Sequence, residues 1–171
     1  MSTINLGYAC INTTINCTSN KTFRLSSYSE ERLKETIEEN LNCLDKIIEW
    51  NYKNKIKFFR IGSGLIPFAS HEICTFNWQD FYKEKFKKIG NKIKKYGIRV
   101  SMHPDQFVVL NSPNEKIVEK SIREMEYHCD VLDLLRIKND GKITLHVGGM
   151  YGNKEEAIER FISNYNKLPK R

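Results

Sequence analysis

Apolar and polar positions alternate along the chain in a pattern that predicts four strands, each followed by a helix. Short apolar runs predict buried strands at residues 5–10, 56–62, 98–103 and 142–147. Apolar residues that recur every three or four positions predict amphipathic helices over residues 29–51, 79–96, 114–135 and 154–167. A capping box of Ser27 and Glu30 is expected to begin the first helix, and Gly97 to end the second in a left-handed conformation.

This regular alternation predicts an α/β protein with a parallel sheet and right-handed crossovers. Doubly wound sheets and (β/α)8 TIM-type barrels both have this order of elements. No linker, low-complexity segment or internal sequence repeat divides the chain. We therefore expect a single domain over residues 1–171.

The composition fits a packed globular protein, because 40% of the residues are hydrophobic and 11% are aromatic. No apolar run approaches the roughly 20 residues needed to span a bilayer, and the first residues lack the pattern of a secretory signal. We therefore expect a cytoplasmic protein with no membrane partner. The net charge of +7 fits a polyanionic partner such as nucleic acid, although a solvated lysine-rich surface would give the same charge.

The cysteines follow no recognisable framework. They are Cys10, Cys17, Cys43, Cys74 and Cys129. Their number is odd and no two of them form a CxxC pair, so we expect neither a zinc ribbon nor a disulfide framework. We interpret them mostly as reduced, buried side chains that behave as small hydrophobic residues.

Three of the four histidines fall at or after the end of a predicted strand. His103 ends the third strand, His146 closes the fourth, and His71 lies in the loop beyond the second. Parallel α/β folds gather functional groups at the carboxyl ends of their strands, so neighbouring strands would bring His103 and His146 close enough to share an ion. Imidazole suits zinc, manganese or iron. The alternative for each residue is a buried, hydrogen-bonded histidine, which is how we interpret His128 inside the third helix.

The loop after the third strand places an amide beside an aromatic ring. Gln106 and Phe107 could hydrogen-bond an unpaired base and fill a gap in a base stack, or Phe107 could pack beneath its own loop. Arg60 lies in the second strand, just before a glycine-rich turn at residues 62–64. It could contact a phosphate or a carboxylate, or it could form a structural ion pair.

Several stretches of the chain resemble the UV damage endonuclease family. They are Leu6-Gly7-Tyr8 with Cys10 and Asn12, FRIGSGLIPFASH at 59–71, RVSMHPDQF at 99–107, and LHVGGMYGNK at 145–154 followed by Arg160-Phe161. These independent motifs occur in the family's order over essentially the whole chain, which makes the resemblance specific.

The resemblance implies a (β/α)8 barrel of the TIM type, of which this chain would supply about the first four units. It implies a cluster of divalent ions at the barrel mouth, typically manganese, and hydrolysis of a DNA phosphodiester 5′ to a UV photoproduct. His103 and His146 would be metal ligands, and His71 a further metal or active-site histidine. All three would then be catalytic residues acting on damaged double-stranded DNA.

The resemblance also implies how the lesion is found. Gln106 and Phe107 would probe the duplex while the damaged dinucleotide is flipped out, and Tyr8 and Asn12 would line the lesion pocket. The probing aromatic residue can be tyrosine in the family. Phe107 keeps the stacking surface but lacks the hydroxyl group.

Four strand–helix units are half of a barrel, which typically needs about 250 residues. In the family the following strands carry carboxylates and more histidines of the metal cluster, and two or three histidines are a poor site for several hard ions. We therefore expect a fragment with weak or absent activity alone, and with open strand edges that could self-associate. We see no sign of an obligate protein partner. The alternatives are a sugar isomerase or epimerase of the same barrel class, and a non-catalytic fragment without a metal site.

Overall fold

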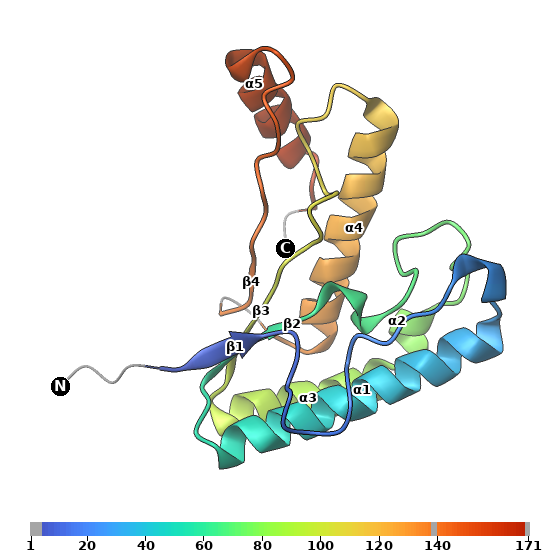
Figure 1. The fold of residues 1–171 in the computed structure, drawn as a ribbon, viewed down its shortest axis with the longest axis vertical. Coiled ribbons are helices and arrows are strands. Elements are labelled where there is room, and N and C mark those ends of the chain that lie inside the picture. The colour runs from blue at the N-terminus through green and yellow to red at the C-terminus, as the bar shows by residue number, and fades with distance from the viewer. Residues whose placement is uncertain (1–4, 138–139, 170–171) are drawn as a thin grey trace.

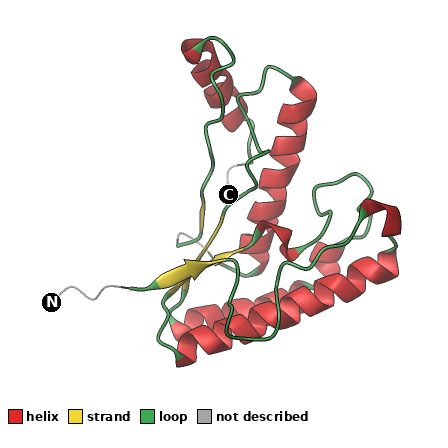
Figure 2. Cartoon of the chain, in the orientation of Figure 1, coloured by secondary structure: helices red, strands yellow, loops and turns green. Residues whose placement is uncertain are grey.

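Four parallel strands form the sheet of the computed structural model, which describes residues 5–137 and 140–169 (Figures 1 and 2). In the order in which they lie side by side, the strands are β1 (Gly7–Ala9), β2 (Phe58–Ile61), β3 (Arg99–Met102) and β4 (Lys142–Ile143). The helices are α1 (Glu30–Lys53), α2 (Trp78–Phe81), α3 (Lys83–Tyr96), α4 (Glu115–Leu134) and α5 (Lys154–Tyr165). Short 3-10 turns lie at η1 (Leu25–Ser27) and η2 (Ser63–Leu65). The predicted α/β fold is confirmed, and the arrangement is consistent with part of a TIM-type barrel.

The register of the strands separates two faces of the sheet. Phe59 pairs with Tyr8 on one side and with Val100 on the other. Phe59 and Val100 are buried in the core with the helices. Because side chains alternate along a strand, Arg60 and its register partner Ser101 lie on the opposite face. The carboxyl ends of the parallel strands lie at the same edge of the sheet.

The three longest helices, α1, α3 and α4, each present an apolar face to this core. The residues that predicted the first helix are fully buried in α1, namely Leu33, Ile37, Leu41, Leu44 and Ile48. Those of α3 are buried as well, namely Phe86, Ile89 and Ile93. Burial of an apolar side chain of this size contributes about 1.5–3 kcal/mol. Within residues 5–137 and 140–169, no helix is both long and apolar enough to cross a membrane.

The helix ends agree with the prediction at one site and differ at another. Gly97 ends α3 with φ 61°, as expected. The capping box predicted at Ser27 and Glu30 is wrong, because Ser27 belongs to η1 and Ser29 caps α1. The Ser29 hydroxyl accepts a hydrogen bond from the Arg32 N–H at 3.2 Å. A capping side chain must directly precede the first helical residue, and Ser29 meets this condition.

The fourth strand is shorter than predicted. Among residues 140–169, Lys142 and Ile143 alone pair with β3, and one further bond joins the Thr144 N–H to the Met102 carbonyl oxygen at 3.0 Å. β3 itself ends at Met102, and Pro104 has no N–H to extend the ladder. Residues 146–153 are therefore exposed and lie outside the sheet.

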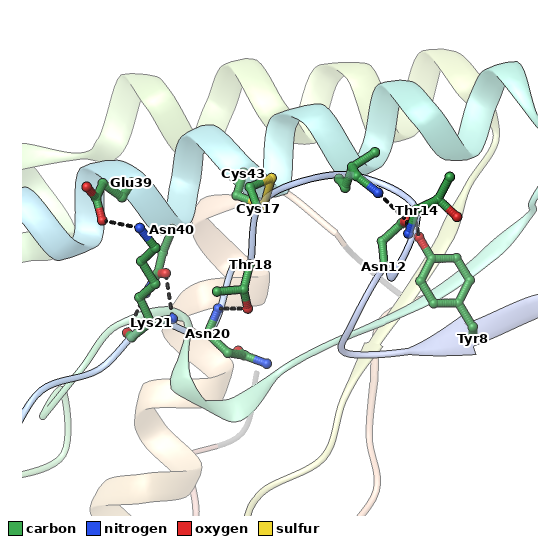
Figure 3. The surroundings of a disulfide bond; sticks show 11 residues. Tyr8, Asn12, Thr14, Cys17, Thr18, Asn20, Lys21, Glu39, Asn40 and Cys43 are labelled. Atoms are coloured by element: carbon green, nitrogen blue, oxygen red, sulfur yellow. Dashed lines mark hydrogen bonds and ion pairs between the residues drawn. A yellow bond between two sulfur atoms is a disulfide. The ribbon is translucent and has the colours of Figure 1, made fainter.

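A disulfide bond joins Cys17 to Cys43, so the expectation that the cysteines are mostly reduced is wrong for this pair (Figure 3). The long loop after β1 runs back along α1 and places the two Cα atoms 5.8 Å apart, within the usual disulfide range. The two residues are 26 positions apart in the sequence, and no local pattern reveals that the loop takes this path. Cys10 and Cys74 keep free thiols.

Candidate active site at the strand ends

Two histidines meet at the carboxyl ends of β3 and β4. His103 follows β3 directly, and His146 lies just beyond β4. Their ring centroids are 4.8 Å apart and the ring planes meet at 69°. His103 is half-buried, whereas His146 is exposed. The expected proximity of the two rings is confirmed, and one ion or one phosphate group could contact both.

A backbone carbonyl fixes the orientation of the His103 ring. Its Nδ1 atom lies 2.7 Å from the carbonyl oxygen of Pro104. Because a carbonyl oxygen only accepts hydrogen bonds, Nδ1 carries the proton and donates it. The lone pair of neutral His103 is then on Nε2. A metal-binding histidine is commonly held in this way, by a bond from its other ring nitrogen.

The histidine pair gains no third ligand from the part of the chain that the structure describes. No group of three or more His, Cys, Asp or Glu side chains there could hold a metal ion. His71, expected to be a further metal or active-site residue, is exposed on the loop after β2, where its Nδ1 accepts a hydrogen bond from the Ile73 N–H at 3.1 Å. The structure therefore does not bring His71 into a three-ligand cluster. Two imidazoles leave most of the coordination sphere of a hard divalent ion to oxygen donors from elsewhere.

Asn111 holds the segment that carries His146. Its side-chain Nδ2 donates to the Gly149 carbonyl oxygen at 2.7 Å, and its backbone carbonyl oxygen accepts from Arg160 Nε at 3.0 Å. Gly148 has φ 99°, and a Cβ atom there would lie 2.2 Å from Asn111 Oδ1. The absence of a side chain at Gly148 therefore lets the Asn111 amide approach the backbone closely. This contact fixes the backbone directly after His146.

The loop between His103 and Val109 projects two exposed side chains. Gln106 is exposed, and Phe107 is 78% exposed. The alternative in which Phe107 packs beneath its loop is therefore wrong. Asp105 accepts from the Ser63 hydroxyl at 3.0 Å, and the Val109 N–H donates to the Ser121 hydroxyl at 3.0 Å. These bonds anchor the loop on both sides of Phe107.

Two buried residues of α4, Tyr127 and His128, lie beneath the loops at the strand ends. Tyr127 donates to the Ser63 carbonyl oxygen at 2.7 Å and accepts from the Ile66 N–H at 3.1 Å. Burial raises the pKa of Tyr127, which keeps it protonated as a donor. His128 is fully buried and its Nδ1 donates to the Glu124 carbonyl oxygen at 2.7 Å. Burial lowers the pKa of His128, which favours the neutral, structural histidine that we expected.

Tyr8 and Asn12, expected in a lesion pocket, contact each other and α1. Asn12 Nδ2 donates to the Tyr8 hydroxyl at 2.7 Å, and Tyr8 donates to Asn51 Oδ1 at 2.7 Å. Burial raises the pKa of Tyr8, while its bonds to the two amides oppose that shift. Sequence reasoning did not identify Asn51. Its signal is a polar residue that continues the buried face of α1 after Ile48.

Arg60 has no carboxylate partner in the described part of the chain. No ion pair of Arg60 is found there, and its Nε is buried without a hydrogen-bond partner. The structural ion pair considered for Arg60 is therefore not formed by these residues. Its position in β2 places Arg60 on the sheet face opposite the core.

A family model decides between the barrel classes that share this geometry. The model of the UV-endonuclease UvdE family matches residues 4–171. The chain belongs to the UV-endonuclease family. This membership confirms the resemblance carried by the motifs at the strand ends. It also separates the chain from the sugar isomerases and epimerases considered as an alternative.

Relatives of the UV-endonuclease family extend well beyond this chain. This chain is 46% identical to the UV DNA damage endonuclease of Clostridium perfringens (strain 13 / Type A) over 163 residues, which are 95% of this chain and 40% of the relative. It is 36% identical to the UV DNA damage endonuclease of Bacillus cereus (strain B4264) over 160 residues, covering 90% of this chain and 50% of the relative. The crystal structure of SacUVDE matches with a TM-score of 0.93 and 47% identity, covering 98% of this chain and 57% of that one. The chain thus spans about half the length of these relatives.

Proposed function

We propose that the chain supplies the lesion-probing half, and two metal ligands, of a UV DNA damage endonuclease. The complete enzyme would hydrolyse the DNA phosphodiester 5′ to a UV photoproduct. The observation that carries this proposal is the exposed Phe107 ring on an anchored loop directly after His103. This loop places the stacking ring of Phe107 close in sequence to His103, which forms the pair with His146. An enzyme that converts sugars would not need such a stacking ring.

Gln106 and Phe107 act on the duplex in this proposal. UV photoproducts weaken pairing and stacking, so extruding the damaged bases costs less free energy than extruding intact ones. Phe107 fills the gap that extrusion leaves, and Gln106 offers hydrogen bonds to the unpaired bases opposite. Recognition then depends on how easily the DNA deforms and not on its base sequence. The net charge of +7 favours association with any duplex.

His103 and His146 would hold one divalent ion, which we propose to be manganese. When bound, such an ion neutralises phosphate charge and activates water for hydrolysis. Nε2 of His103 fits this role because Nδ1 is already used as a donor. The described residues supply two imidazoles and no third His, Cys, Asp or Glu ligand, so they fit only part of a site. We therefore expect this chain alone to bind manganese weakly and to hydrolyse DNA slowly or not at all. His71 remains a candidate active-site residue in this proposal.

The decisive experiment is fluorescence anisotropy with a duplex that contains one photoproduct and with the undamaged duplex, at fixed salt. The wild-type chain should prefer the damaged duplex. Phe107→Ala should lose roughly five- to a hundredfold in affinity for it, the range expected from one stacked base. Phe81→Ala is the matched control, because Phe81 is also strongly exposed, at 62%, and lies on α2. A wild-type chain without preference, or equal effects of both substitutions, would contradict the proposal.

A further inference from the structure

Hydrogen bonds on both sides of the Asn12 amide hold it in one orientation. Asn12 follows β1 and is only 5% exposed. Its Oδ1 accepts hydrogen bonds from the Thr14 N–H at 2.9 Å and the Ile15 N–H at 3.2 Å, which makes a tight turn (Figure 3). Because Oδ1 is occupied by two donors, Nδ2 must face the Tyr8 hydroxyl, to which it donates at 2.7 Å.

The Tyr8 hydroxyl then needs an acceptor for its own proton. Asn51 Oδ1 lies 2.7 Å away and accepts it. Asn51 is fully buried, and its Nδ2 has no hydrogen-bond partner within the described part of the chain. Turning the Asn51 amide round would place a second donor against Tyr8 and leave the phenol proton without an acceptor. Only the observed orientation completes the chain of bonds from Asn51 through Tyr8 to Asn12.

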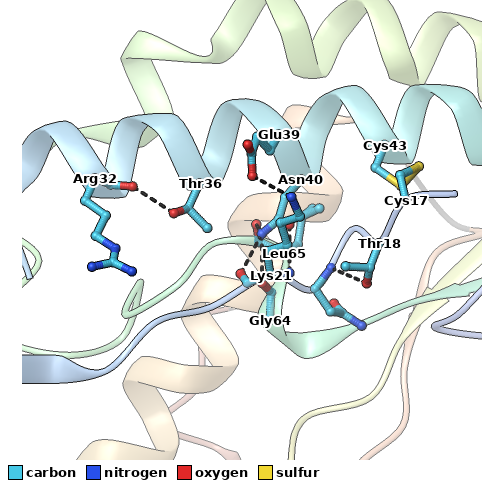
Figure 4. A network of polar contacts seen from close by, with 11 residues as sticks. Cys17, Thr18, Lys21, Arg32, Thr36, Glu39, Asn40, Cys43, Gly64 and Leu65 are labelled. Carbon is cyan, nitrogen blue, oxygen red and sulfur yellow. Dashed lines mark hydrogen bonds and ion pairs between the residues drawn. A yellow bond between two sulfur atoms is a disulfide. The ribbon is translucent and has the colours of Figure 1, made fainter. Parts of the chain in front are cut away.

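α1 holds the same loop at two further points. Asn40, also fully buried, accepts from the Lys21 N–H at 2.8 Å and donates to the carbonyl oxygens of Lys21 at 2.9 Å and Leu65 at 3.0 Å (Figure 4). Cys43 binds Cys17 through the disulfide. Asn40 and Asn51 lie about three helical turns apart and therefore on the same side of α1. Of the three α1 residues, Asn51 is the one that contacts β1 itself, and it reaches Asn12 through the Tyr8 hydroxyl.

We infer that Asn51 is a positioning residue for the binding of damaged DNA. It holds the Tyr8 hydroxyl, and Tyr8 in turn orients the amide of Asn12. This inference rests on the proposed function. An asparagine amide has two N–H donors, and Tyr8 takes only one of them. No hydrogen bond of the second N–H is found within the described residues, and in this inference it donates to a carbonyl oxygen of an extruded pyrimidine. A fixed donor loses less conformational entropy on binding than a mobile one does.

The first test measures positioning without DNA, by amide hydrogen exchange at Thr14 and Ile15. Asn51→Leu removes the acceptor at similar volume and should speed exchange at these two amides roughly five- to tenfold, the scale of one hydrogen bond. Asn51→Asp keeps an acceptor oxygen and should restore slower exchange. Asn42→Ala is the matched control, because Asn42 is an exposed asparagine of the same helix. Amides of β3 report the general stability and should be unaffected in all three variants.

A second variant keeps this test decisive if Asn51→Leu folds poorly. Tyr8→Phe removes the hydroxyl that joins the two amides and should speed exchange at the same two sites. The double variant should be no worse than either single one, because all three residues form one chain of bonds. Unchanged exchange at Thr14 and Ile15, or an equal change in β3, would overturn the positioning role.

The second test compares damaged and undamaged duplexes. Asn51→Leu should weaken binding of the photoproduct duplex roughly fivefold or more and leave binding of the undamaged duplex unchanged, with partial rescue by Asn51→Asp. Equal weakening of both duplexes would overturn the link to the lesion. If the wild-type chain itself shows no preference, the proposed function and its link to Asn51 fail together. The exchange data would still decide whether Asn51 positions Asn12.

Discussion

The imidazole rings of His103 and His146 lie 4.8 Å apart although they belong to different strand–helix units. We expect either histidine, when replaced by alanine, to reduce the affinity for Mn²⁺ at least roughly tenfold, since changes to residues that merely support metal ligands already reach this scale. Isothermal titration calorimetry of the wild type, His103→Ala and His146→Ala measures it.

His71→Ala is the control for this prediction. His71 lies outside any three-ligand cluster of the described residues, so we expect its loss to change Mn²⁺ affinity less than loss of His103 or His146. If His103→Ala and His146→Ala both bind Mn²⁺ as the wild type does, the histidine pair is not a metal site.

The disulfide between Cys17 and Cys43 should stabilise the folded chain. It closes a loop with a sequence separation of 26, and removing it should lower the free energy of unfolding by about 2–4 kcal/mol. Urea denaturation of the wild type with and without dithiothreitol measures this difference, and the Cys17→Ser, Cys43→Ser double variant should resemble the reduced wild type. Cys74→Ser, which removes a free thiol, should keep the response to reductant. A midpoint that does not change on reduction would argue against the bond.

His128 should make the stability of the protein depend on pH. Burial lowers its pKa in the folded state below the ordinary value of 6.5, while nearby Glu124 and Asp105 oppose this shift. The unfolded chain therefore takes up the proton first as the pH falls, and the contribution of His128 to stability is complete above about pH 6.5 and declines below it. Urea midpoints between pH 7.5 and about pH 5 should fall less steeply in His128→Leu than in the wild type. Equal slopes would contradict this prediction, and His71→Ala controls for the loss of an exposed histidine.

The order of elements was predictable because each helix and strand is encoded by its own local pattern. Leu33, Ile37 and Leu41 define the buried face of α1 from sequence alone, and Gly97 marks the end of α3. The length of β4 was not predictable in this way. It depends on how far β3 offers a partner, and β3 ends at Met102, two residues before Pro104.

The candidate site was predictable only in part, because some of its contacts depend on how distant segments of the chain pack together. His103 and His146 could be paired because parallel neighbouring strands end at the same edge. Asn51 and the Cys17–Cys43 bond depend on the path of a long loop along α1, and no local pattern encodes that path. A polar residue on the apolar face of a helix is the signal that could have directed attention to Asn51.

The attachment of the loop after β1 to α1 also has a thermodynamic consequence. Asn40, Cys43 and Asn51 order this loop during folding, so its conformational entropy is already lost before any ligand arrives. Binding at this end of the sheet should therefore lack the large negative heat-capacity change that accompanies coupled folding and binding. A ligand that meets this loop would encounter a surface of fixed shape, and its complementarity to that surface would decide how tightly it is held.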